Sequence, residues 1–185
     1  MIITISGDIG SGKSTCGKLL CSRLGYQYLS TGAIQRQIAA DMGLTTLELN
    51  HLTDSRRDID DKIDSYTRAL NDTSEDYVVD SRLAWHFIPS SYKVYLRCEE
   101  RIAAQRISGD QQRTSDESNR DIDHLLTKIL ARRKSEKERF KRIYDINFAD
   151  LLNYDQVIDS SYFTPDEIVD FILDGRRLYL ESGVP

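Results

Sequence analysis

The first fifteen residues hold the side chains best suited to chemistry. An apolar run over residues 2–5 gives way to a glycine-rich turn that ends in Lys13 and Ser14. With Gly7 and Gly12, these residues match the pattern G-x-x-x-x-G-K-[ST] in register. Glycines let backbone N–H groups curl around phosphate oxygens, and a helix that starts at Lys13 would direct its positive end at the same anion. The pattern therefore predicts a nucleotide phosphate site.

Each part of this phosphate loop has an expected task. We expect Lys13 to reach the β- and γ-phosphates and the Ser14 hydroxyl to bind a Mg²⁺ ion that bridges them. The alternative is a glycine-rich strand-to-helix turn with a chance lysine, which the flanking apolar run and predicted helix disfavour. The residues assigned to the phosphates are Gly7, Asp8, Ile9, Gly10, Ser11, Gly12, Lys13, Ser14 and Thr15.

A carboxylate ends the buried-looking segment 77–80. Asp80 occupies the end of this predicted strand, where proteins with a phosphate loop place a residue that contacts Mg²⁺ through water. The alternative is an ordinary strand-end turn residue. Arg82 points to the same face as Asp80 if the chain stays extended, so a cation and an anion would lie side by side near the phosphates.

A long predicted helix that begins near Asn119 combines apolar and charged residues on one face. Its inward positions, at alternating steps of three and four, are Ile122, Leu125, Ile129, Arg132, Glu136, Arg139 and Ile143. Because apolar residues occupy both ends of this stripe, we expect the three charged residues to line a polar cavity and to need a ligand or one another. The arginines suit phosphate, and the carboxylate can accept from a hydroxyl or an amine. An internally paired salt-bridge ladder remains the alternative.

Two segments follow the first predicted helix. Ser30 or Thr31 is predicted to cap a short helix, and Arg36 faces away from the apolar side of that helix. Residues 45–70 are typical of one polar, heavily charged helix, which would pack loosely and could move. Its narrow apolar stripe consists of Leu47, Leu49, Leu52, Ile59, Ile63 and Tyr66.

Strands and helices alternate along the chain. Strands are predicted over 2–5, 26–29, 77–80, 92–98 and 156–159, and helices over 13–24, 99–108 and from 164 onward. Gly25 is expected to stop the first helix, and Thr164-Pro165-Asp166-Glu167 to cap the start of the last. This alternation behind a phosphate loop predicts an α/β fold, a single P-loop three-layer sandwich over 1–185 with a parallel sheet of about five strands.

Composition limits the partners. The 185 residues carry a net charge of −5, which argues against a broad nucleic-acid footprint or a membrane-surface role. We therefore expect a monomer that binds a small molecule, without a nucleic acid polymer or a membrane. Cys16, Cys21 and Cys98 show no disulfide or zinc spacing, and no basic leader or membrane-length apolar run is visible. These features favour a cytoplasmic protein, and the three histidines indicate no metal site.

Two classes of function fit these features. A kinase for a small phosphorylated or hydroxylated metabolite needs a second anion pocket and a polar lid. A nucleotide-hydrolysing switch needs base-reading and switch motifs instead. The guanine-reading pattern N-K-x-D is absent, and so is a D-x-x-G pattern after the second strand. The additional arginines favour the kinase, and a regulatory NTPase remains the alternative.

Several motifs besides the phosphate loop are shared with a known family. They are Ser30-Thr31-Gly32 with Arg36, Arg57-Asp58-Ile59-Asp60, Val78-Val79-Asp80-Ser81-Arg82-Leu83-Ala84, Arg132-x-x-Ser135-Glu136-x-x-Arg139 followed by Tyr144, and Tyr154-Asp155-Gln156-Val157-Ile158-Asp159. On these motifs the chain resembles the nucleoside monophosphate kinases, and most closely the compact, archaeal-type cytidylate kinases. The likeness runs almost from end to end.

The resemblance implies transfer of the γ-phosphoryl group of ATP, with Mg²⁺ as cofactor, to CMP or dCMP. It implies catalytic roles for Lys13, Arg82 and Arg132, and metal contacts for Ser14 and Asp80. Arg106 would join the ATP contacts, and residues 109–120, which lack aliphatic and aromatic side chains, would form a lid. An insert over about 31–72 would bind the acceptor nucleotide. The acceptor contacts would be Ser30, Thr31, Arg36, Asp60, Asp80, Arg82, Arg132, Glu136 and Arg139.

Three features depart from the family pattern. Asp8-Ile9 is atypical within the phosphate loop, Ser81 replaces a usual glycine, and Ala103 stands where compact relatives often carry arginine. The kinase assignment survives these changes. They leave the base and sugar of the acceptor open, with another small metabolite as the alternative substrate.

Overall fold

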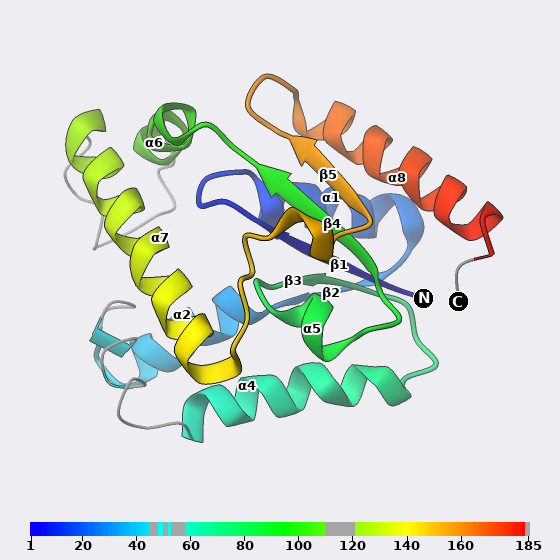
Figure 1. Cartoon of the computed structure of the whole chain (residues 1–185), viewed down its shortest axis with the longest axis horizontal. Helices are drawn as coiled ribbons and strands as arrows, with labels where there is room; N and C mark the ends of the chain where they lie inside the picture. The colour runs from blue at the N-terminus through cyan, green and yellow to red at the C-terminus, as the bar shows by residue number, and fades with distance from the viewer. Residues whose placement is uncertain (45–47, 50–51, 53–57, 110–120, 184–185) are drawn as a thin grey trace.

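The chain folds around one parallel sheet of five strands, as the sequence predicts. The computed structural model describes residues 1–44, 48–49, 52, 58–109 and 121–183. The strand order across the sheet is β2-β3-β1-β4-β5, and every neighbouring pair is parallel. The strands are β1 (Ile2–Gly7), β2 (Gln27–Ser30), β3 (Tyr77–Asp80), β4 (Tyr92–Arg97) and β5 (Gln156–Asp159). β1 is central, so its phosphate loop opens at the middle of the carboxyl edge of the sheet (Figure 1).

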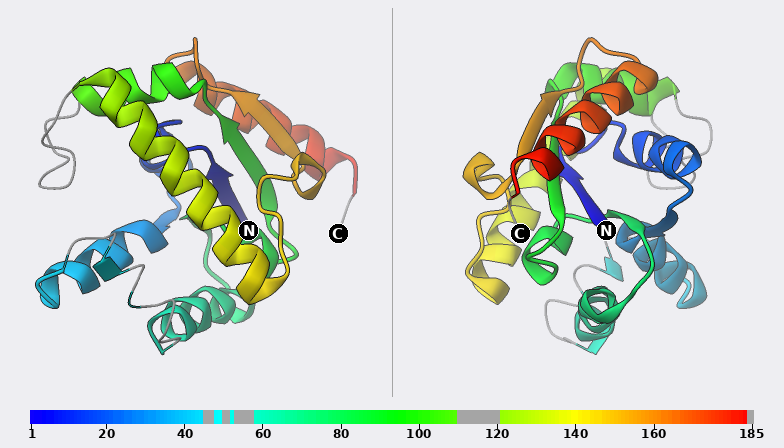
Figure 2. Two further views of the ribbon diagram at one scale, coloured as in Figure 1. Left: turned by 60° about the vertical axis from the view of Figure 1, so that its left-hand side comes forward. Right: turned by 90° about the vertical axis from the view of Figure 1, so that its right-hand side faces the viewer.

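Helices cover both faces of this sheet. They are α1 (Lys13–Leu24), α2 (Thr31–Asp41), α4 (Asp58–Ala69), α5 (Ala84–Phe87), α6 (Glu100–Gly109), α7 (Ile122–Tyr144) and α8 (Pro165–Glu181), with 3₁₀ turns at Leu70–Asp72 and Leu151–Asn153. Helices α1 and α8 pack together on one face. Helix α5 and the end of α7 lie on the other, and Figure 2 shows α1 and α7 on opposite sides of the sheet.

The core lies between the sheet and the α1–α8 layer. Ile3 and Ile5 of β1 are fully buried there against Leu20 of α1 and Ile172 of α8. Burial of a side chain of this size contributes about 1.5–3 kcal/mol. Because the central strand is buried on both faces, it reads as a nearly continuous apolar run. This core holds the start of the phosphate loop in place.

Local signals for helix ends are confirmed. Gly25 adopts a left-handed conformation at φ 71° directly after α1. Ser30 caps α2, because its Oγ accepts a hydrogen bond from the Ala33 backbone at 3.2 Å. Thr164 and Glu167 form the predicted capping box at the start of α8. Each signal acts within four residues, so the rest of the fold is not needed to read it.

The predicted helix over 45–70 is helical at its described residues, 48–49, 52 and 58–69, and Leu70 begins a 3₁₀ turn. Helix α2 ends at Asp41, a turn over 42–44 follows, and α4 begins at Asp58. Much of the segment between these helices lies outside the described residues. Tyr66, assigned to the buried stripe, is 71% exposed, because it lies at an open groove of about 500 Å³ between α2 and α4.

Three other residues of the predicted stripe are buried. Leu49, Ile59 and Ile63 are buried with Ala39 of α2 in a small cluster of their own. This cluster holds α4 against α2 independently of the main core. The predicted looseness of the segment stays a prediction, and the predicted lid lies outside the described residues except for Gly109, which ends α6.

Candidate active site

The phosphate loop has a backbone that glycine alone accommodates at its two ends. Gly7 has φ 144°, and a Cβ there would lie 2.2 Å from the Leu96 carbonyl oxygen. Gly12 has φ 84° and caps α1 without a side-chain hydrogen bond. Helix α1 starts at Lys13, so its free backbone N–H groups and the positive end of its dipole lie at the loop. No acidic residue in the first turn of α1 offsets this positive charge. The loop is therefore built to receive an anion.

Lys13 is folded back into the loop. Its Nζ donates to the carbonyl oxygens of Gly7 at 3.0 Å and Asp8 at 2.5 Å, and to Ser11 Oγ at 3.4 Å. Burial, and after it the nearby Arg82 guanidinium, lower the pKa of Lys13 to about 7 against the opposing effect of surrounding carboxylates. Phosphate groups placed beside Nζ would restore its positive charge.

Ser14 and Asp80 lie together, as predicted. Ser14 Oγ donates to Asp80 Oδ2 at 2.6 Å, and the hydroxyl of Tyr28 donates to the same oxygen at 3.0 Å. Burial, with the Asp80 charge beside it, raises the pKa of Tyr28, so this hydroxyl keeps its proton. Sequence reasoning missed Tyr28. Its place on β2 was the available signal. Because β2 pairs with β3 and Ser30 lies opposite Asp80, Tyr28 is two residues from the position that faces this carboxylate.

The oxygen donors at this point fit a magnesium ion. Mg²⁺ prefers hard oxygen ligands and keeps several waters, so one hydroxyl and one carboxylate beside a phosphate site suffice. Within the described residues no group of three or more His, Cys, Asp or Glu side chains could hold a metal by itself. A metal at Ser14 and Asp80 would therefore need the phosphates of a bound nucleotide as further ligands.

Arg82 connects the phosphate loop to α7. Its Nη1 donates to the Gly7 carbonyl oxygen at 3.1 Å, and its Nε pairs with Glu136 Oε2. The other oxygen of Glu136 accepts from Arg132 Nε at 2.9 Å. Burial opposes the charge of Glu136, but the two guanidinium groups hold its pKa below the usual range. Two arginines and one carboxylate thus face the loop with a surplus positive charge.

Arg139 does not extend this network as the predicted ladder would have it. It forms a buried ion pair with Asp60 of α4, where each side chain is 9% exposed. One turn further along α4, Asp64 accepts a hydrogen bond from the hydroxyl of Tyr144 at 2.7 Å. The charged face of α7 therefore turns inward at Glu136 and Arg139, whereas the Arg132 side chain is 41% exposed.

The other predicted acceptor contacts lie on α2. Ser30 is buried and committed to its cap, and Thr31 is half-buried at the first position of the helix. Arg36 is exposed and folds back over Gly32, without an ion-pair partner among the described residues. Arg36 is therefore available to a ligand, whereas the Ser30 side chain is occupied.

Arg106 joins α6 to two loops. Its Nη2 donates to the Ser160 and Ser161 carbonyl oxygens at 2.6 and 3.2 Å, and its Nη1 lies 3.4 Å from the Gly10 carbonyl oxygen. Ala103, one turn earlier, is buried against Gly10, where a Cβ on the glycine would come within 2.7 Å. The residues after β5 thus border the phosphate loop, which the sequence did not indicate.

Comparisons with known proteins agree with this geometry. The model of the cytidylate kinase-like family matches residues 2–162. A cytidylate kinase from Sulfolobus acidocaldarius is 35% identical over 175 residues, which cover 94% of this chain and 92% of that protein. An S-adenosylmethionine-dependent nucleotide dehydratase from Lacinutrix mariniflava is 33% identical over 93% of this chain, but the match covers 35% of that protein. The solved shikimate kinase from Bacteroides thetaiotaomicron superposes with a TM-score of 0.66 at 12% identity, over 94% of this chain and 97% of that one, which shows a shared fold.

Proposed function

Because the chain belongs to the cytidylate kinase-like family, we propose that it transfers the γ-phosphoryl group of ATP to the phosphate of CMP or dCMP. The observation that carries this proposal is the meeting of Lys13, Arg82 and the Ser14–Asp80 pair at one phosphate loop. A cation on each side of an anion site, with oxygen donors for a metal, is what phosphoryl transfer requires. The nearby arginines on α7 would supply positive charge to a second anionic substrate.

The proposed reaction needs little acid–base catalysis from the protein. An oxygen of the acceptor phosphate forms a bond to the γ-phosphorus, the bond from that phosphorus to the bridging β,γ-oxygen breaks, and ADP leaves with the electron pair. The attacking oxygen is already anionic, so no general base is needed. Catalysis then depends on positioning and on neutralising charge, the roles proposed for Lys13, Arg82 and Arg132.

Mg²⁺ would bind Ser14 directly and Asp80 through water. There it would supply positive charge that offsets the charge of the phosphates. Asp80 also fixes the direction of the Ser14 hydroxyl, and Tyr28 fixes Asp80 in turn. The loop backbone would hold the phosphates, and Arg106 would support the nucleotide from the side of α6.

Asp80→Asn is expected to raise the concentration of free Mg²⁺ needed for half-maximal rate by about tenfold, the scale of losing one residue that orients a metal ligand. The measurement is the initial rate against free Mg²⁺ at fixed ATP. Tyr28→Phe is the matched control, because it removes one hydrogen bond to Asp80 and keeps the carboxylate. An unchanged magnesium requirement in Asp80→Asn would remove Asp80 from the metal site.

Glu136→Gln is expected to change the choice of acceptor more than the rate with the best acceptor. A carboxylate reads hydroxyl and amino donors, whereas it contributes nothing favourable to phosphoryl charge. The measurement is kcat/KM for CMP, dCMP and UMP in the variant and the unmodified protein. Equal losses for all three acceptors would instead assign Glu136 to holding Arg82 and Arg132.

The experiment that tests the proposal is ADP release in a coupled assay. CMP, dCMP, UMP, AMP, GMP and small hydroxylated metabolites are compared as acceptors with Mg·ATP. We expect the highest kcat/KM with CMP or dCMP. A preference for a hydroxylated metabolite would support the alternative of a metabolite kinase, and no acceptor-dependent release would favour a regulatory NTPase.

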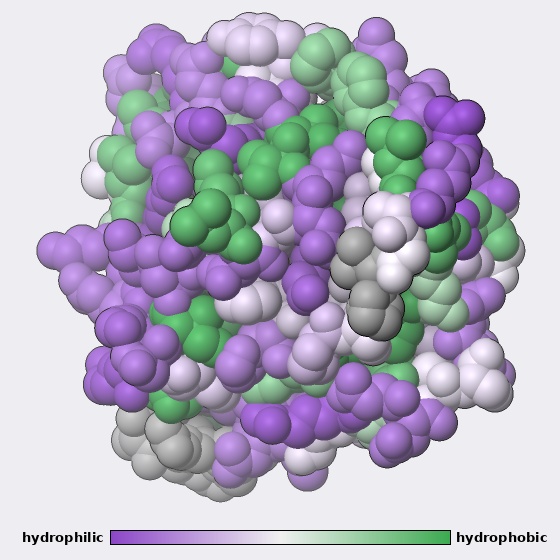
Figure 3. Space-filling view, turned by 45° about the vertical axis from the view of Figure 1, so that its right-hand side comes forward, coloured by the Kyte–Doolittle hydropathy of each residue, from purple (hydrophilic) through white to green (hydrophobic). Residues whose placement is uncertain are grey.

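The remaining expectations concern the molecule as a whole. Figure 3 shows hydrophobic residues gathered in patches among hydrophilic ones on one face. Among the residues that the structure describes, no helix combines the length and apolar character needed to cross a membrane. A monomeric state and a cytoplasmic location stay predictions.

A further inference from the structure

Asp8 places a carboxylate inside the phosphate loop, where its charge would repel a nucleotide. The Asp8 side chain is nevertheless mostly buried, with 11% of its surface exposed, and both of its oxygens accept hydrogen bonds. Oδ1 accepts from the hydroxyl of Tyr95 at 3.0 Å, and Oδ2 accepts from the backbone N–H of Cys98 at 3.0 Å. These contacts tie the loop to β4 and to the residue that follows it.

A third contact joins this carboxylate to α7. Arg133 Nη2 lies 3.4 Å from Asp8 Oδ1, and Arg133 Nη1 lies 3.0 Å from Glu100 Oε1 in the first turn of α6. One guanidinium group thereby spans the phosphate loop, α6 and α7, and offsets the charge of Asp8. Its side chain is 42% exposed, and exposed ion pairs contribute about 0–1 kcal/mol. Stability is therefore a small part of what this contact provides.

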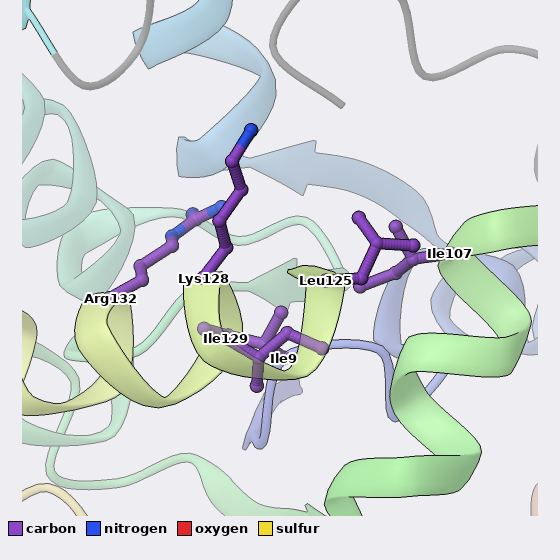
Figure 4. Close-up of a pocket in the computed structure, with 6 residues that line it drawn as sticks. All are labelled: Ile9, Ile107, Leu125, Lys128, Ile129 and Arg132. Carbon is purple, nitrogen blue, oxygen red and sulfur yellow. The ribbon is translucent and has the colours of Figure 1, made fainter. Parts of the chain in front are cut away.

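The next loop residue docks on the same helix. Ile9 is buried in a cluster with Ile107, Leu125 and Ile129, and Figure 4 shows it against Ile129, beside a cavity of about 30 Å³. Ile129 and Arg133 are four residues apart, so they lie on one face of α7. Consecutive residues of the loop thus contact consecutive turns of α7, one through charge and the other through apolar packing.

We propose that Asp8 is a positioning residue that, through Arg133, sets α7 against the phosphate loop. This rests on the proposed kinase function. Arg132 precedes Arg133, and Glu136 follows it by one turn, so a rotation or slide of α7 would move both relative to Lys13. Because a displacement near 1 Å can cost about 10²-fold in rate, a weak contact can have a large effect on turnover.

Two single variants and their combination test this role. Asp8→Asn keeps one oxygen for the Cys98 N–H and an amide that can donate to the Tyr95 oxygen, so it removes chiefly the charge that pairs with Arg133. Arg133→Met removes the same contact from the half-exposed side, together with the exposed ion pair to Glu100, and should fold in any case. Lys134→Met is the matched control. Lys134 is the next residue along α7, its side chain is 79% exposed, and it pairs with Glu138 on the surface of the helix.

We expect kcat with CMP to fall about tenfold in both single variants and in Asp8→Asn/Arg133→Met together, because all three lose one shared contact. The ATP KM should stay within about threefold, and Lys134→Met should match the unmodified protein. Arg133→Lys should recover part of the rate, since it restores the charge without the fork.

Three results would overturn the positioning role. The first is an unchanged kcat in both single variants, and the second is losses of rate that multiply in the double variant. The third is an effect confined to the ATP KM, which would mean that Asp8 acts only through its charge on ATP binding at the loop. An unmodified protein that is itself inactive with every acceptor would contradict the proposed function and the positioning role together. The activity of the unmodified protein therefore separates the two failures.

Discussion

Lys13→Met is expected to lower kcat by about 10²–10³-fold, the loss seen when one preorganised contact to transition-state charge is removed. Nζ already lies within the loop, where it donates to the carbonyl oxygens of Gly7 and Asp8. The measurement is steady-state ADP release with CMP at saturating Mg·ATP. Lys18→Met is the matched control, because Lys18 is an exposed cation on the same helix. Near-normal kcat in Lys13→Met would mean that the phosphate loop is not catalytic.

The same variant should not be less stable than the unmodified protein. Burial lowers the pKa of Lys13 to about 7 from its ordinary value of 10.5, so between these pH values the unfolded chain binds the proton that the folded chain has lost. Stability of the unmodified protein should therefore rise as the pH increases from 7 toward 10. Lys13→Met should lack this contribution in thermal melts across that range. An equal rise in stability with pH in both proteins would contradict the contribution assigned to Lys13.

Arg139→Met is expected to lower kcat/KM for the acceptor by about 10–100-fold while the ATP KM changes little, because a charged hydrogen bond contributes about 1.5–3 kcal/mol and ATP is held at the phosphate loop. It should also destabilise the fold by about 3–5 kcal/mol, since it leaves the buried Asp60 carboxylate without the partner in its ion pair. Two-substrate kinetics and thermal melts measure the two effects separately.

The double variant Asp60→Asn/Arg139→Met separates stability from function. It should recover most of the lost stability, because neither member of the Asp60–Arg139 pair is then left as an unpaired buried charge. It should not recover the acceptor kinetics if Arg139 contacts the nucleotide. Lys141→Met is the control, because Lys141 is on the same helix and its ion pair with Asp145, the residue after the helix, is exposed. Recovery of acceptor kinetics along with stability would return Arg139 to a structural role.

Short-range features of this protein were predictable because their causes are local. The phosphate loop is defined by glycine conformations and by a helix start within nine residues, and the structure has them at Gly7 and Gly12. Gly25 stops α1 for the same kind of reason. Alternation of apolar runs with helical periods was sufficient for the parallel sheet, since buried parallel strands need helical crossovers.

Predictions weakened where a charged helix had no strong period of its own. Leu49, Ile59 and Ile63 belong to a thin apolar stripe, and they are buried in one cluster with Ala39 of α2. Tyr66 shows the result, because its spacing fits the stripe while its side chain faces an open groove. Periodicity identifies a face of a helix, but a partner element decides whether that face is covered.

By itself the sequence determined a phosphate loop, its lysine and its serine, and an inward charged face on α7, all of which depend on spacing within one element. The tertiary structure alone decided the partners. Arg139 pairs with Asp60, 79 residues away, and Asp8 meets Arg133. Such pairs follow from which helices the sheet order brings together, and a carboxylate in a sequence can pair with any arginine that the fold places within about 4 Å of it.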